Sequence, residues 1–166
     1  LRIGGLPLPA VPLMATGVLL LAWNFYKTMA ARKVSQIYIS NWFFLLATLA
    51  VAVIVVIGYV PWFNRGLSQP VIQGWYMHNA VGMWFTPLAV GATYYTLPKL
   101  LNKPIYSYAL GVLGFWTHIV FYTLIGTHHY IFSPVPVWLQ TTAIIFSTAM
   151  MVPVWASTGH FLLTLR

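Results

Sequence analysis

Two adjacent histidines, His128 and His129, and the tyrosine six residues before them, Tyr122, are the side chains best suited to chemistry. They lie in a run otherwise rich in Phe, Ile, Val, Leu and Trp. Polar groups that leave water without finding a partner cost several kcal/mol. A metal ion is the simplest partner for two neighbouring imidazoles. The pair therefore predicts a functional site within an apolar segment.

The composition predicts an integral membrane protein. Of the 166 residues, 60% are hydrophobic and 5% are charged, whereas soluble domains carry about 25% charged residues. The net charge of +8 comes from single Lys and Arg residues scattered between apolar runs. Such scattering indicates membrane topology, so we expect a lipid bilayer and no nucleic acid as partner.

The sequence contains no Asp, Glu or Cys. This excludes paired-carboxylate catalysis, carboxylate and thiolate metal ligands, and disulfides within the chain. Any chemistry must therefore come from His, Tyr, Ser, Thr, Asn and the aromatic residues.

The elements that must position the histidines are apolar segments long enough to cross a membrane. About 20 residues cross a hydrocarbon core of about 30 Å, and inside lipid a helix satisfies its own backbone hydrogen bonds. We predict an all-α integral membrane fold, a single membrane domain over residues 1–166. Its five transmembrane helices are expected over residues 13–31, 38–60, 74–97, 106–131 and 138–165.

Three connections separate the later helices. Residues 63–73 are expected to form a loop, residues 98–104 a short basic loop, and residues 133–136 a tight turn. The chain starts at Leu1, without Met or a signal peptide, so we expect an internal piece of a longer polypeptide.

The charges predict an orientation for these helices. Five crossings divide the cations into two sets, and the larger set is expected on the cytoplasmic side. The larger set is Lys27, Arg32, Lys33, Lys99, Lys103 and Arg166, and the smaller is Arg2 and Arg65.

This topology places a third histidine beside the pair. His78 lies near the outer end of the third segment, and His128 and His129 lie near the outer end of the fourth. Consecutive antiparallel helices are usually neighbours, so the three imidazoles could converge on one ion, for which copper or zinc is best suited. Adjacent side chains point about 100° apart on an ideal helix. We therefore expect a distorted turn, for which Gly126 offers freedom.

Tyr122 and His118 are expected on the stripe of the helix that carries His129. The phenol would lie about 10 Å deeper than His129, where it could donate a proton, or an electron and a proton. Simpler explanations exist: buried histidines are often bonded to backbone carbonyls, and tyrosines often lie at membrane interfaces. We expect His118 to support the site or to pack, and His160 to be structural.

Several short motifs resemble the catalytic subunit of the cbb-type cytochrome c oxidases, the C family of haem-copper oxygen reductases. The resemblance extends from about Lys33 onward. The similar stretches are Trp75–Gly82, Phe115–Thr117, Gly126–His129, Ile131–Pro134, Trp138–Thr141 and Pro153–Ala156.

The resemblance implies a centre of high-spin haem b and a copper ion, CuB. It makes His78, His128 and His129 the copper ligands and Tyr122 the redox-active tyrosine, covalently bonded to His78. The implied reaction is four-electron reduction of O2 to water, coupled to proton translocation across the bacterial cytoplasmic membrane. Electrons would come from membrane-anchored monohaem and dihaem cytochrome c subunits.

The chain also departs from the family pattern. In that family the axial histidines of the high-spin and low-spin haems lie on helices outside the segment matched here, so the resemblance implies that the remaining helices of the subunit carry them. Ser107 and Tyr108 are candidates for a proton path, but Gly111 stands where a further hydroxyl is expected. Two alternatives remain: a nitric oxide reductase-like member of the superfamily, with iron in place of copper, and a non-catalytic membrane paralogue.

Overall fold

The computed structural model describes residues 2–3, 6–7, 9–59 and 65–166, and these form a helical bundle. The α-helices are α1 (Ala10–Ala30), α2 (Ile39–Tyr59), α3 (Ser68–Asn79), α4 (Thr86–Leu101), α5 (Tyr108–Tyr122), α6 (Val137–Ala149) and α7 (Met151–Leu165). A π-helix, η1 (Ala80–Phe85), joins α3 to α4, and a 3₁₀ helix, η2 (Gly126–Tyr130), follows α5. Two short strands that the sequence did not predict, β1 (Arg2–Ile3) and β2 (Leu6–Pro7), pair antiparallel before α1.

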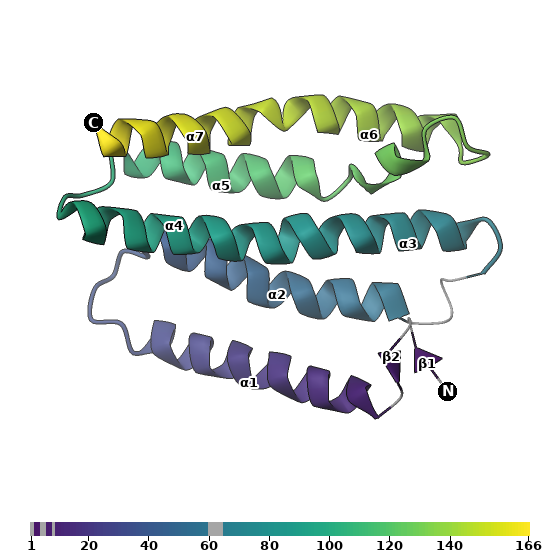
Figure 1. Cartoon of the computed structure of the whole chain (residues 1–166), viewed down its shortest axis with the longest axis horizontal. Helices are drawn as coiled ribbons and strands as arrows, with labels where there is room; N and C mark the ends of the chain where they lie inside the picture. The colour runs from purple at the N-terminus through teal and green to yellow at the C-terminus, as the bar shows by residue number, and fades with distance from the viewer. Residues whose placement is uncertain (1, 4–5, 8, 60–64) are drawn as a thin grey trace.

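The long helices run side by side as a series of hairpins, with α3–η1–α4 and α6–α7 each forming one long rod (Figure 1). Helix α2 packs against α1 and α4, and α5 packs against α7. One stripe of α2 is buried at a spacing of three to four residues, as expected for a helix with one packed face: Ile39, Phe43, Ala47, Val51, Ile54 and Gly58.

An aromatic cluster forms the core where α2, α4 and α5 meet. The Phe43 and Tyr94 rings stack with centroids 5.7 Å apart, and Phe115 meets Phe43 edge-on at 5.2 Å. Such aromatic pairs contribute about 0.5–1.5 kcal/mol each beyond the area they bury. This cluster fixes α5, and with it the segment that carries the histidine pair.

The cations divide between the two ends of the bundle as the five-helix prediction requires. The α1–α2 loop, the α4–α5 loop and the C-terminus lie at one end, with the larger set of cations, and β1 and the start of α3 lie at the other (Figure 1). In the described part of the chain, α2 and the rod Val137–Leu165, which α6 and α7 form together, are long and apolar enough to cross a membrane.

The helix predicted over residues 74–97 is longer than expected at both ends. It begins at Ser68, within the expected loop 63–73, and continues past Pro98 to Leu101, within the expected loop 98–104. Pro98 cannot donate to the carbonyl of Tyr94 four residues before it, and the Tyr38 hydroxyl donates to that carbonyl instead, at 3.1 Å. The helix then ends at Asn102, whose φ of 51° is a common helix-terminating conformation.

The π-helix η1 is an irregularity that the sequence prediction missed. In a π-helix, the carbonyl of Gly82 would pair with the residue five positions on, which is Pro87 and has no N–H. The buried His118 Nε2 donates to that carbonyl at 2.7 Å. Pro87 thus leaves an acceptor in the middle of the bundle, and a histidine on α5 satisfies it.

The fourth and fifth predicted segments, 106–131 and 138–165, are each interrupted. Helix α5 stops at Tyr122 rather than residue 131, and the chain bends before η2. The fifth segment has a break at Met150, because Pro153 removes the donor for the carbonyl four residues earlier. The predicted end of the second segment at residue 60 lies outside the described residues.

Candidate metal centre

The three predicted histidines meet at one point between α3 and η2. His78 Nδ1 lies 3.1 Å from His129 Nε2, and His128 Nε2 lies 3.2 Å from His129 Nε2. One nitrogen from each ring falls within 4.8 Å of the other two. His78 is buried, His128 is half-buried and His129 is exposed.

His78 occupies the last turn of α3, and contacts from Trp75 fix that turn against the segment after α5. The indole Nε1 of Trp75 donates to the carbonyl of Thr123 at 2.9 Å. Gly126 lies so close to Trp75 that an added Cβ would be 2.7 Å from its Cα. These contacts join the two halves of the site.

The break after Tyr122 allows two adjacent histidines to face the same point. The His128 amide donates to the carbonyl of Ile125 at 3.0 Å, which starts the tight 3₁₀ turn of η2. The His128 and His129 rings lie 4.4 Å apart and nearly perpendicular, at 87°. The distortion expected near Gly126 is therefore present, but close packing on Trp75 is what requires glycine there.

Tyr122 lies inside the site rather than below it. Its ring stacks on His78, with centroids 4.4 Å apart and planes at 17°. On its other side it stacks on His118 at 5.1 Å. A Cβ on Gly82 would collide with the Tyr122 ring, so the phenol fills the space that this glycine leaves. The expected depth difference of about 10 Å assumed a continuous helix.

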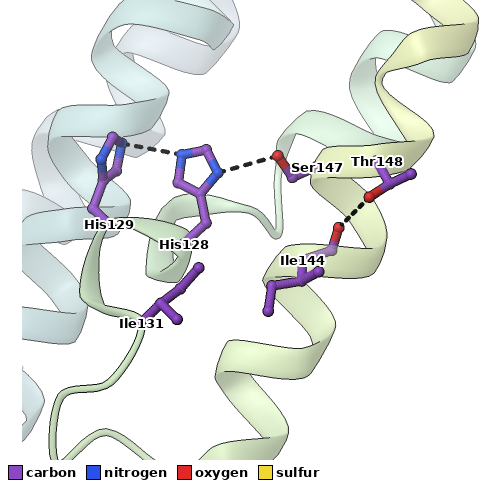
Figure 2. A pocket seen from close by; sticks show the side chains of 6 residues that line it. All are labelled: His128, His129, Ile131, Ile144, Ser147 and Thr148. Carbon is purple, nitrogen blue, oxygen red and sulfur yellow. Dashed lines mark hydrogen bonds between the residues drawn. The ribbon is translucent and has the colours of Figure 1, made fainter.

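Ser147 on α6 is a site residue that the sequence analysis did not single out. Its Oγ lies 3.2 Å from His128 Nδ1, on the side of the ring away from His129 (Figure 2). Ser147 also lines an open pocket of about 500 Å³, which His128 and His129 border. The sequence does contain one hint of this role. Ser147 is a polar residue that directly follows Ile144, Ile145 and Phe146 in an apolar helix.

The donor set fits a copper or zinc ion. Nitrogen atoms bound to one ion at about 2 Å lie roughly 3 to 4 Å from each other, and the distances of 3.1 and 3.2 Å match that spacing. Three imidazoles without carboxylate or thiolate suit copper or zinc. His78 Nε2 is buried without a hydrogen-bond partner among the described residues, whereas Nδ1 of the same ring faces His129.

The remaining two histidines do not fit a haem iron, because each is committed to another partner. His118 donates to the carbonyl of Gly82. His160 is fully buried, with Nδ1 3.2 Å from the Tyr94 hydroxyl and Nε2 accepting from the Ser107 amide at 3.4 Å. Among the described residues, both histidines outside the triad therefore have hydrogen-bond partners within the bundle.

The candidate proton-path residues lie at the end of α5 opposite the triad. Ser107 caps α5, its Oγ accepting from the Leu110 amide at 3.2 Å. The Tyr108 hydroxyl donates to the Ile37 carbonyl at 2.8 Å and lies 3.3 Å from Trp42 Nε1, which donates to it. Both side chains thus make contacts that fasten α5 to its neighbours.

Comparison with known proteins finds relatives that are subunit I proteins of cytochrome oxidases. The sequence model of a family described as "Cytochrome C and Quinol oxidase polypeptide I" matches residues 5–166. The chain is 34% identical over 150 residues to subunit CcoN1 of the cbb3-type cytochrome c oxidase of Stutzerimonas stutzeri, covering 85% of this chain and 32% of that protein. It is 34% identical over 154 residues to the cytochrome c oxidase subunit 1 homolog of Azorhizobium caulinodans, covering 85% and 28%.

The chain spans about a third of the length of these curated relatives. Within that third, the family match includes α1 to α7 and all three histidines of the triad. These matches confirm the resemblance to the cbb-type oxidases, and the chain belongs to the cytochrome c and quinol oxidase polypeptide I family.

Proposed function

We propose that this chain forms part of the catalytic subunit of a cbb-type cytochrome c oxidase, which reduces O2 to water at a haem b and CuB centre. Electrons would come from cytochrome c, and the reaction would be coupled to proton translocation. The observation that carries the proposal is the convergence of His78, His128 and His129, whose ligand nitrogens lie within 4.8 Å of one another.

His78, His128 and His129 would hold the copper through one nitrogen each. When bound, copper supplies a one-electron redox centre and a Lewis acid at the triad. The protein keeps the three rings in place through the Trp75 contacts and the η2 turn. The pocket beside His128 and His129 leaves that side of the triad open in this segment.

Tyr122 would be the residue of this chain that donates a proton and an electron to the reduction of O2. Its phenol stacks directly on His78, so a proton at its oxygen lies beside the ligand ring. The covalent bond that the resemblance implies would join these two side chains. In the structure the two rings are in contact and face each other at 17°.

Tyr122 also favours an oxidase over a nitric oxide reductase-like enzyme. In the latter the non-haem metal is iron, assisted by glutamates, and no tyrosine has this role. The present chain has no Glu and places Tyr122 against a ligand histidine. Both features support copper at the triad.

The helices would cross the bacterial cytoplasmic membrane five times, as α1, α2, α3–η1–α4, α5–η2 and α6–α7. The concentration of cations at one end of the bundle supports an orientation with that end in the cytoplasm. The remaining helices of the subunit would carry the axial ligands of both haems. Membrane-anchored monohaem and dihaem cytochrome c subunits would deliver the electrons.

Substituting a triad histidine tests this proposal. In the purified complex, His128→Ala should lose copper and nearly all oxygen consumption, because two imidazoles remain for a site built from three. Metal content is measured by elemental analysis and oxygen consumption with reduced cytochrome c, after gel filtration shows that the complex is assembled.

Each alternative gives its own result. Unchanged copper and unchanged oxygen consumption in His128→Ala would reject the oxidase proposal. Iron at the triad of the wild-type complex would indicate a nitric oxide reductase-like enzyme. A wild-type complex with no metal at the triad would indicate a non-catalytic paralogue.

A further inference from the structure

His128 is held from outside the triad by a side chain of another helix. Ser147 lies on α6, and its Oγ is 3.2 Å from His128 Nδ1 (Figure 2). The opposite nitrogen of the same ring, Nε2, lies 3.2 Å from His129 Nε2 and therefore faces the triad. The two ring nitrogens of His128 thus have separate partners.

This arrangement suits the tautomer of His128 that a metal bound at Nε2 would need. A neutral imidazole carries its proton on one nitrogen and a lone pair on the other, and only the lone pair can bind a metal. The Ser147 oxygen can accept a hydrogen bond from Nδ1–H, and in that tautomer the lone pair is on Nε2, the nitrogen that faces the triad. A hydrogen bond to the remote nitrogen also fixes the ring plane and raises the basicity of the ligand.

Helix α6 contacts η2 at a second place besides the Ser147 contact to His128. The Thr127 hydroxyl donates to the Leu139 carbonyl at 3.0 Å, which fastens the start of α6 to the residue before His128. By contrast, the buried Nε2 of His78 has no hydrogen-bond partner among the described residues. The serine contact is therefore not repeated at His78.

We propose that Ser147 is a positioning residue that orients His128 and sets its Nε2 as the metal-binding nitrogen. This inference rests on the proposed copper site and adds to it a residue from α6. It assigns to Ser147 a hydrogen-bonding role that depends on the hydroxyl and not on the volume of the side chain.

Thr148 provides a matched control on the same helix. It lines the same pocket, but its hydroxyl donates to the carbonyl of Ile144 at 3.0 Å and not to a histidine (Figure 2). A variant at Thr148 therefore removes a hydroxyl from the same region without removing a contact to the triad.

The test measures how tightly the assembled complex retains copper against increasing concentrations of a copper chelator. Ser147→Ala and Ser147→Val should weaken retention by about 10- to 100-fold, the usual effect of losing such a partner. Ser147→Thr, which matches valine in shape but keeps the hydroxyl, should retain copper nearly as the wild type does. Thr148→Val should also behave as the wild type.

The outcomes separate this inference from the proposed function. A wild-type complex without copper would overturn both. Wild-type copper retention in Ser147→Ala, or equal losses in Ser147→Val and Ser147→Thr, would overturn the positioning role alone. Failure of Ser147→Ala to assemble would also overturn it, because the serine would then be needed for packing.

Discussion

At the scale of single residues, the site depends on Tyr122 lying between two imidazoles. Its ring is stacked on His78 at 4.4 Å and on His118 at 5.1 Å. The spacing in the sequence predicted that Tyr122 and the histidines belong together, but it placed the phenol too deep. That error came from extending α5 to residue 131, when the helix stops at Tyr122 itself.

Removing the hydroxyl of Tyr122 should separate metal binding from turnover. Tyr122→Phe keeps the stacked ring, so copper content should be unchanged, whereas oxygen consumption should fall by about 10²–10⁴-fold, the usual contribution of a positioned proton donor. Tyr76→Phe is the control, because that hydroxyl pairs with Tyr59 at 3.0 Å. Full oxygen consumption in Tyr122→Phe would exclude a catalytic role for the phenol.

At the scale of elements, the π-helix η1 joins the site to the bundle. Pro87 leaves the carbonyl of Gly82 without a backbone donor, and His118 supplies one from α5 at 2.7 Å. The sequence correctly marked His118 as a supporting or packing residue. It could not show the π-helix, because an extra residue in a helical turn follows from contacts across the bundle and not from local propensity.

The glycine in η1 should be sensitive to a single added methyl group. In Gly82→Ala the new Cβ meets the Tyr122 ring, which cannot move away because it lies between His78 and His118. We expect a loss of about 1–3 kcal/mol in stability, measured as a lower midpoint of thermal unfolding of the purified complex.

Gly159→Ala is the matched control, since Gly159 is helical and an added Cβ there has no atom within 4 Å in the structure. It should be neutral or slightly stabilising, by up to about 1 kcal/mol. Equal effects of the two substitutions would show that the Tyr122 contact does not restrict Gly82.

At the scale of the whole molecule, hydropathy and charge predicted a helical bundle and the division of cations between its ends. Helix boundaries were predicted less well, because Pro98 lies within a helix that a contact from Tyr38 maintains, whereas Pro153 lies just after a break. Membership of the oxidase family was evident from short motifs around the histidines. Ser147 was not, because a lone serine in an apolar helix carries no spacing pattern.

We propose above that the bundle brings three histidines, one from α3 and two from η2, together around one copper ion. Copper-edge X-ray absorption of the purified wild-type complex tests it most directly, with His78→Ala as the comparison. We expect a shell of three imidazole nitrogens in the wild type, and the loss of one nitrogen or of all copper in His78→Ala. An absence of copper in the wild type, or an identical copper shell in both proteins, would contradict it.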